Sequence, residues 1–332
     1  MIERIEIKDF TVFDELKTDF VPGVNLFIGA NGTGKTHLLK LMYTFQSSGI
    51  SSGLYKDPSN KLVTVFRPYK LSVKRLIRRG KGFKKEASCS MIKDGVKLLC
   101  TITEKGADIN ADIQYIKPDK AVYIPVKEML ANAPGFRSLY KERHVHFGEV
   151  YLDIIDKAFL PPLKNIQKGQ QDILKILQKE MGGKVHFEQE EFFLKQKSTE
   201  FEFSLVAEGI RKLALLWLLV SNGALDKGTT LYWDEPETNL NPSILQSVVK
   251  VLLALERLGV QIFIATHSYE LMKEFELQQK DHSICFSSLF KEEDGSISIN
   301  SAKTYHQLFP NKIADEFSRI YDLEIARSIK GK

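Results

Sequence analysis

Residues 24–36, VNLFIGANGTGKT, decide the fold that we expect for this chain of 332 residues. An apolar strand ends in glycine, and Gly29 to Thr36 match the pattern G-x-x-x-x-G-K-[ST]. The helix expected next carries an apolar face made of Leu38, Leu39, Met42 and Tyr43. A strand, a glycine-rich loop and a helix in this order predict a phosphate-binding loop (P-loop), whereas a chance glycine-rich turn would not need both flanking elements.

The residue types of this loop predict how it would hold a nucleotide. Glycines let backbone N–H groups fold around phosphate oxygens, and the N-terminus of the following helix adds a favourable dipole. We expect Lys35 to bridge the β- and γ-phosphates of ATP and the Thr36 hydroxyl to bind Mg²⁺. The candidate ATP-binding residues of the loop are Gly29, Asn31, Gly32, Thr33, Gly34, Lys35 and Thr36.

A second apolar strand ends in two carboxylates, in the stretch LYWDEPETNL (residues 231–240). We expect Asp234 to bind Mg²⁺ and Glu235 to orient or deprotonate the attacking water, because ATP hydrolysis needs both tasks at one strand end. A charged exit from a strand is the alternative for this pair taken alone. The presence of the P-loop makes the catalytic interpretation the better one.

A third apolar strand, within IFIATHS (residues 262–268), ends at His267. A histidine at this strand end can reach a γ-phosphate from the same edge of the sheet as Asp234. For an isolated histidine, a hydrogen-bonded helix cap is the usual alternative. Its spacing after Asp234 favours a catalytic role, so the candidate catalytic residues are Lys35, Glu235 and His267.

Strands that alternate with helices at both ends of the chain predict an α/β protein. Between them the period changes to two, which favours β-structure. We expect a hairpin at Asp94-Gly95 and an antiparallel layer over most of 61–116. The individual strands expected in the first half are 2–8, 61–68, 107–116 and 121–126.

The second half of the chain predicts a helical region and a return to alternating strands and helices. Residues 127–182 are expected to be mostly helical, and short strands are expected at 184–189 and 200–205. A later helix should begin after Asn241 as N-cap, with Pro242 at its first position. The last expected element is an amphipathic helix at 312–328.

Composition and charge describe an ordinary globular protein with one basic segment. The chain has 43% hydrophobic and 27% charged residues and a net charge of +5. Eight Lys and Arg residues and no acid lie within Lys70–Lys85, which favours either a nucleic-acid contact or a solvated surface. Three dispersed cysteines, an N-terminus without a signal peptide and no membrane-length apolar run predict a cytoplasmic protein that does not contact a membrane.

The order of the P-loop, DEPETNLNP (residues 234–242) and IATHS (residues 264–268) resembles the ATP-binding-cassette (ABC) ATPases. More narrowly, it is similar to their soluble branch, which includes RecF, SMC and the OLD-type ATPases. This resemblance implies an ABC-ATPase head with a P-loop parallel-sheet core, an antiparallel β layer and an inserted helical lobe. The implied division is 1–126 for the P-loop half, 127–208 for the helical lobe and 209–332 for the second half.

The resemblance also implies that two heads form a homodimer around two ATP molecules. Each P-loop would then face the partner's signature motif, a position held here by VAEGI (residues 206–210), with Ala207 and Gly209 as candidate nucleotide contacts. Residues 239–241 would lie in the loop that crosses the interface, which adds Asn241 to these candidates. The glutamine loop should follow residues 121–126, where Lys127 and Glu128 stand instead.

Two departures from the family pattern shape the functional hypothesis. Ala207 replaces the signature serine, which predicts a weakened signature and slow basal hydrolysis. The chain also lacks a long coiled coil and the nuclease domain of the OLD type, so an effector such as a nuclease would be a separate chain. We therefore expect a sensor or motor in a nucleic-acid transaction, with phage defence as the setting. A nucleotide-gated scaffold and the nucleotide-binding subunit of a transporter are the alternatives.

Overall fold

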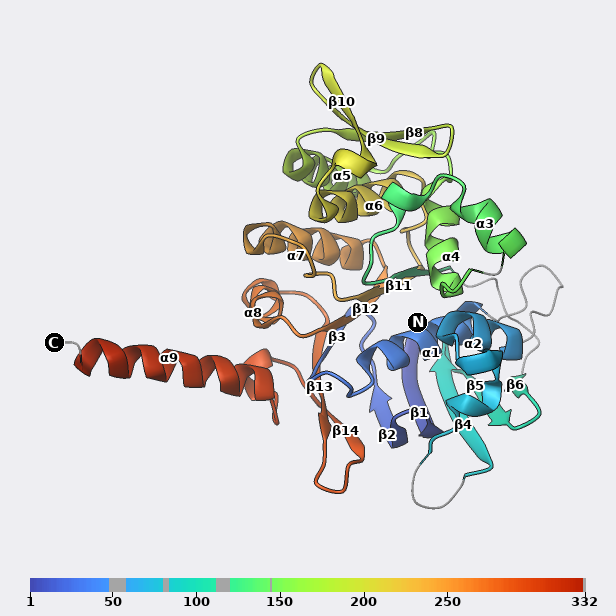
Figure 1. The fold of residues 1–332 in the computed structure, drawn as a ribbon. Coiled ribbons are helices and arrows are strands. Elements are labelled where there is room, and N and C mark those ends of the chain that lie inside the picture. Colours follow the sequence, from blue (N-terminus) through green and yellow to red (C-terminus); the bar gives the residue numbers. More distant parts are fainter. Residues whose placement is uncertain (48–57, 80–83, 112–119, 144, 331–332) are drawn as a thin grey trace.

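A computed structural model describes residues 1–47, 58–79, 84–111, 120–143 and 145–330. Its centre is a six-stranded sheet in the order β14-β13-β3-β12-β11-β7, in which β14 pairs antiparallel with β13 and the other pairs are parallel. Figure 1 shows helices and a second sheet on either side of these strands. The strands are β3 (Val24–Ile28), β7 (Ala121–Ile124), β11 (Thr230–Asp234), β12 (Gln261–Thr266), β13 (Ile284–Lys291) and β14 (Ile297–Ala302).

The central strands are apolar throughout because both faces of the sheet are covered. All residues of β3, β7, β11 and β12 are buried. One face packs on α1 and the antiparallel sheet, and the other packs on α5, α6, α7 and α8. Parallel strands buried on both sides are expected to be continuous apolar runs, which is the pattern that the sequence shows. The helices are α1 (Lys35–Ser47), α5 (Lys168–Met181), α6 (Glu208–Ser221), α7 (Pro242–Arg257) and α8 (Tyr269–Gln278).

A five-stranded antiparallel sheet in the order β2-β1-β4-β5-β6 confirms the predicted β layer. Asp94 and Gly95 have φ of 48° and 75°, as the predicted two-residue hairpin requires. The buried amide of Gln261 joins the two sheets, because it accepts from the Ile2 N–H at 2.7 Å and donates to the Ile2 carbonyl at 2.8 Å. The strands are β1 (Ile2–Phe10), β2 (Phe13–Asp19), β4 (Glu86–Lys93), β5 (Val96–Thr103) and β6 (Ala107–Ala111).

The strand predicted at 61–68 is wrong, because this segment is helix α2 (Pro58–Phe66). Its β-branched and aromatic residues favour strands, but Pro58 stands at the first helical position, where proline is well tolerated. The buried Lys61 explains the helix, since its ammonium reaches Glu149 at 3.0 Å and Asp153 at 2.8 Å on another helix. Tertiary contacts thus override local propensity. The strand predicted at 107–116 is confirmed only to Ala111, and 112–119 lie outside the described residues.

The predicted helical lobe contains more strands than expected. A three-stranded sheet in the order β10-β9-β8 stands where two strands were predicted, and residues 203–205 form a 3₁₀ turn. The uncounted strand follows a turn at Gln189 and Glu190, which both have positive φ (48° and 68°). The elements are α3 (Phe136–Arg143), α4 (Glu149–Ala158), β8 (Lys184–Glu188), β9 (Glu191–Gln196) and β10 (Thr199–Glu202).

The chain ends in α9 (Lys312–Lys330), which Figure 1 shows projecting from the body. Its first turn packs on the core through Ile313 and Ala314, and the Phe317 ring stacks on Tyr269 with centroids 4.3 Å apart. The predicted cap of α7 is confirmed, because Asn241 Oδ1 accepts from the Ser243 N–H at 3.0 Å. Within the described residues, none of the helices is long and apolar enough to cross a membrane.

Candidate nucleotide site

The P-loop connects β3 to α1, and two of its glycines have positive φ. Gly32 has φ of 81° and Gly34 has φ of 91°, a region that side chains disfavour. A Cβ on Gly34 would lie 2.5 Å from the Phe13 ring and 2.6 Å from Val12, so glycine also lets the turn between β1 and β2 pack on the loop. A Cβ on Gly32 would meet open space. The loop backbone at Gly32 is therefore accessible to a ligand.

The Lys35 ammonium lies within the curve of the P-loop. It donates to the Gly29 carbonyl at 2.6 Å and to the Ala30 carbonyl at 3.2 Å, and the side chain is buried. Burial lowers the pKa of Lys35, and the charges of Glu235 and Asp234 oppose this shift. The loop thus holds a desolvated cation near two carboxylates, a position from which it can move to a phosphate.

Asp234 and Thr36 lie side by side although 198 positions separate them in the sequence. The Thr36 hydroxyl donates to Asp234 Oδ1 at 3.0 Å, and the Tyr123 hydroxyl donates to Oδ2 at 3.2 Å. Burial raises the pKa of Asp234 to about 6, and the two hydroxyls partly offset this shift. A buried carboxylate beside a hydroxyl offers the hard oxygen ligands that Mg²⁺ prefers, so these residues fit the ion.

Glu235 has a strained backbone at the carboxyl end of β11. Its φ is 49°, in the left-handed region that non-glycine residues rarely adopt, and its N–H donates to the Ala265 carbonyl at 2.8 Å. The Thr238 hydroxyl donates to Oε2 at 3.2 Å, and His267 Nδ1 lies 3.4 Å from Oε1. The structure therefore brings together Glu235 and His267, two candidate catalytic residues.

Glu237 and Lys212 hold the loop after Glu235, and the sequence gave no signal for either. Glu237 accepts from the Thr266 hydroxyl at 2.7 Å and from the His267 N–H at 3.1 Å. The buried Lys212 ammonium donates to the Thr238 carbonyl at 2.6 Å. Burial lowers the pKa of Lys212, and surrounding glutamates oppose the shift. These contacts fix the relative positions of the β11 and β12 ends.

Two further residues beside Asp234 were also missed. Tyr123 comes from β7 and contacts the carboxylate directly, as described above. Lys40 lies one helical turn after Thr36, and its charge lowers the pKa of Asp234, while burial lowers the pKa of Lys40 itself. The i,i+4 spacing of Thr36 and Lys40 on α1 was the available signal for a second cation at this place.

The signature position lies at the start of α6. Ala207 is exposed and precedes the helix with extended backbone (φ −56°, ψ 140°). Gly209 is buried, and a Cβ there would lie 2.6 Å from the Asn239 carbonyl, so the helix start touches the loop after β11. The expectation that Arg211 or Lys212 could supply a free cation is wrong. Arg211 pairs with the buried Glu128, and Lys212 is held by backbone carbonyls.

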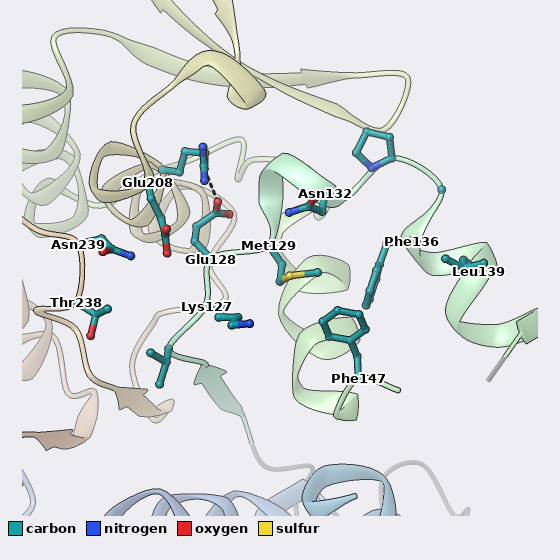
Figure 2. Close-up of a pocket in the computed structure, with 14 residues that line it drawn as sticks. Lys127, Glu128, Met129, Asn132, Phe136, Leu139, Phe147, Glu208, Thr238 and Asn239 are labelled. Atoms are coloured by element: carbon teal, nitrogen blue, oxygen red, sulfur yellow. Dashed lines mark hydrogen bonds and ion pairs between the residues drawn. The ribbon is translucent and has the colours of Figure 1, made fainter. Parts of the chain in front are cut away.

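A hollow of about 960 Å³ lies in front of this helix start. Figure 2 shows Glu208 and Asn239 on one side of it and Phe136, Leu139 and Phe147 on the other. Glu128, at the place where the family would have its glutamine loop, pairs with Arg211 at this hollow. A pair between residues 128 and 211 therefore ties the exit of β7 to the start of α6.

Two family models match this chain. The family described as "AAA domain, putative AbiEii toxin, Type IV TA system" matches residues 102–273, more than half of the chain. The family described as "AAA ATPase domain" matches residues 1–157. Together the two matches contain both the P-loop and the strand ends at Asp234 and His267.

Curated relatives match over short segments. RecF, described as a DNA replication and repair protein, is 57% identical over 42 residues in Lactobacillus gasseri, which is 13% of this chain and 11% of the relative. RecF of Heliobacterium modesticaldum is 46% identical over 48 residues, or 14% of this chain and 13% of the relative. The chain thus spans only about a tenth of the length of these relatives in the matched region.

Solved structures match over nearly the whole chain at low identity. An SMC head bound to the C-winged helix domain of ScpA has a TM-score of 0.60 at 15% identity, with 92% of this chain and 98% of that chain covered. The SMC head of Thermotoga maritima has a TM-score of 0.52 at 11% identity, with 91% and 99% covered. These similarities confirm the predicted ABC-ATPase head fold.

Proposed function

Because this chain belongs to the AAA family of P-loop ATPase domains, we propose that it binds ATP with Mg²⁺ at Gly29–Thr36 and hydrolyses it slowly. The observation that carries the proposal is the 3.0 Å hydrogen bond from Thr36 to Asp234. It joins the end of the P-loop to the end of β11, where an Asp-Glu pair stands. Metal ligand, phosphate loop and catalytic carboxylate thus share one sheet edge.

The proposed residue roles follow from position and charge. Lys35 leaves the Gly29 carbonyl and binds the β- and γ-phosphates, and the other candidates of residues 29–36 hold phosphate oxygens. Mg²⁺, held by Thr36 and Asp234, would neutralise charge that develops on the phosphates. Glu235 orients the attacking water, and His267 contacts the γ-phosphate from the neighbouring strand end.

The proposed active assembly is a homodimer in which the start of α6 faces the partner's ATP. Free N–H groups and the helix dipole suit a phosphate at this end whatever the side chain is. Ala207 lacks the hydroxyl of a serine, a loss of roughly 1.5–3 kcal/mol for a hydrogen bond to a charged oxygen. The expected effect is a tenfold to hundredfold weaker contact, with the site retained. Asn241 would lie in the same interface.

Titration with labelled ATP, with Mg²⁺ or EDTA present, tests the core of this proposal. We expect saturable binding and phosphate release that both depend on Mg²⁺ and disappear in Lys35→Ala. Lys250→Ala, which changes an exposed lysine on α7, is the matched control. Phosphate release that is equal in Lys35→Ala and the unchanged protein would refute the assignment.

The proposed setting is a nucleic-acid transaction, with phage defence through a separately encoded effector as its narrower form. The family description names a toxin of a toxin–antitoxin system, and the RecF relatives are DNA repair proteins. The transporter alternative has no structural observation in its favour. Affinity purification of a tagged Glu235→Gln protein from its own host tests the setting. Co-purification of a nuclease or a nucleic-acid-bound complex supports it, and recovery of the protein alone contradicts it.

The basic stretch offers a smaller contact surface than its charge suggests. Arg78 lies 3.5 Å from Asp14, and Lys84 lies 3.6 Å from Asp9. Lys74 and Arg79 are exposed at a hollow of about 180 Å³, whereas Lys81 lies outside the described residues. If nucleic acid binds here, charge reversal of Lys74 and Arg79 weakens binding and reduces its salt dependence. Unchanged affinity in that variant would remove this surface from the proposal.

A nucleotide-gated scaffold with little turnover is the second candidate function. Ala207 favours it, because a weakened signature lowers the stabilisation of the partner's γ-phosphate. The two functions differ in rate rather than in binding. A single-turnover measurement distinguishes them, since a scaffold would bind ATP and dimerise but release no phosphate within hours.

A further inference from the structure

A lysine-rich hollow of about 540 Å³ lies on the helical lobe, between the end of α5 and the strands β8 and β9. Figure 1 shows these elements at the top of the molecule. Eight residues line the hollow, none of them acidic, and five are lysines: Lys175, Lys179, Lys184, Lys195 and Lys197. All five side chains are on exposed residues. The hollow is separate from the nucleotide site, and the inference drawn from it does not depend on ATP binding.

The end of α5 and the strand β9 are joined tightly beneath these lysines. Gly182 ends the helix in the left-handed conformation, with φ of 69°. A Cβ on Gly183 would lie 2.4 Å from the Lys195 carbonyl, and Gln196 donates to the Met181 carbonyl at 2.7 Å. The backbone therefore fixes the five lysines in one cluster.

The cluster contains two pairs of like charges in unfavourable positions. Lys175 and Lys179 are one helical turn apart on α5, a spacing at which like charges destabilise a helix. Lys184 and Lys195 are directly opposite each other on β8 and β9, which is unfavourable for like charges in a sheet. Asp172 lies 3.5 Å from Lys175 and offsets one of these charges. An anion bound in the hollow would relieve both repulsions.

Two stacked aromatic rings continue the same face of the strand pair. His186 and Phe193 are opposite each other, two residues beyond Lys184 and Lys195, so the alternation of a strand places all four on one face. Their ring centroids are 5.3 Å apart with an interplanar angle of 17°, and both residues are half-exposed. Glu200 on β10 lies 3.4 Å from His186, so acidic charge bounds this face on the β10 side.

We propose that this face of β8 and β9, with the end of α5, binds single-stranded nucleic acid. The lysines contact successive phosphates, and the exposed ring of Phe193 stacks on a base. A positively charged groove beside an aromatic ring is the usual arrangement for single strands, because every unpaired base offers a face for stacking. A duplex keeps its bases stacked on each other and gains only the lysine contacts.

Fluorescence anisotropy with labelled single-stranded DNA and RNA, and with the matching duplex, tests the proposal. The double variant Lys184→Glu, Lys195→Glu should bind single strands at least tenfold more weakly in low salt. The slope of affinity against salt should fall by about 1.4, since about 0.7 is lost per phosphate contact. Lys164→Glu, Lys250→Glu carries the same charge change on exposed residues elsewhere and should bind normally.

Phe193→Ala supplies the test for stacking. It should weaken single-strand binding about fivefold or more and leave duplex binding unchanged. Thermal unfolding of each variant establishes that the lobe is folded. Single-strand binding that ignores the double lysine variant would overturn the proposal, and so would equal effects of Phe193→Ala on both nucleic acids. Lysine-dependent binding to phosphatidylserine vesicles without oligonucleotide binding would overturn it in favour of a membrane surface.

Discussion

The start of α1 and the start of α6 are two helix N-termini that differ in how completely they are equipped for phosphate. At α1 the loop supplies two glycines with positive φ, the Lys35 ammonium and the Thr36 hydroxyl. At α6 Ala207 supplies no side-chain polar atom, and Arg211 is turned to Glu128. Both ends present free N–H groups. Only the first can hold a nucleotide by itself, and the second can at most complete a site that another copy begins.

This difference indicates a division of labour between binding and assembly. A strong P-loop with a weak signature binds ATP first, and the contact between copies adds little extra free energy. Small changes at α6 should therefore alter dimerisation and turnover, whereas changes at α1 should abolish every nucleotide-dependent step. The predictions below separate the two helix starts on this basis.

Glu235→Gln should show the largest effect, a fall in hydrolysis of about 10²- to 10⁴-fold with ATP binding retained. Its amide keeps the shape of the side chain but cannot accept a proton from water. Asp234→Asn is the contrasting variant, because it removes the charge that Mg²⁺ needs and should weaken Mg²⁺-dependent binding as well. Phosphate release and ATP affinity are measured for both. Wild-type hydrolysis by Glu235→Gln would remove Glu235 from its proposed role.

Lys35→Ala should weaken ATP binding by about 100-fold or more, because each charge-assisted hydrogen bond to phosphate is worth roughly 1.5–3 kcal/mol. Isothermal titration with ATP and Mg²⁺ measures the effect. Lys212→Met serves as the comparison at α6, since Lys212 is equally buried but bonds only to backbone carbonyls within the described residues. It should lower stability and spare ATP affinity. The reverse result would assign phosphate binding to the wrong helix start.

Ala207→Asp should weaken ATP-dependent dimerisation by tenfold or more while stabilising α6. Aspartate is a favourable N-cap, worth about 0.5–2 kcal/mol, yet it places a negative charge where the partner's phosphate is expected. Ala207→Ser should instead retain or tighten the dimer. Sedimentation with ATP and thermal unfolding are the two measurements. Equal dimerisation by the serine and aspartate variants would show that this helix start does not face a phosphate.

The free energy of unfolding should depend on pH through Asp234. Its pKa is about 6 in the folded protein and about 3.9 when unfolded, so the folded state binds the extra proton between these values. Stability from this group therefore falls by about 2–3 kcal/mol as pH rises from 4 to 6 and stays lower above. Urea unfolding in EDTA at pH 5 and pH 7.5 measures it. Asp234→Asn should remove this part of the pH dependence, and an unchanged profile would contradict the assignment.

The nucleotide edge could be predicted from sequence because local patterns determine it. A strand, a loop with fixed glycines and a helix specify Gly29–Thr36 almost without tertiary information, and continuous apolar runs specify the buried strands. The partners of Asp234 could not be predicted in this way. Tyr123 and Glu237 act through contacts between distant elements, and no spacing along the chain reports such contacts.

The error at α2 has the same physical origin. The segment 61–68 alternates apolar residues and resembles a strand, but ion pairs of Lys61 with Glu149 and Asp153 hold it as a helix against α4. The hairpin at Asp94-Gly95 was predictable because the turn residues themselves set the backbone. Local chemistry determines turns and caps, whereas long-range pairing determines which face of a segment is buried.

Sedimentation of Glu235→Gln with and without ATP and Mg²⁺ tests the central claim most directly, because this variant should hold ATP without hydrolysing it. We predict a monomer without ATP and a dimer with it, and we predict that adding Gly209→Asp returns the protein to a monomer that still binds ATP. Ala207→Asp in the same background is the second variant, since Gly209 also packs on Asn239 within one copy. A Glu235→Gln protein that binds ATP and remains a monomer would contradict the account.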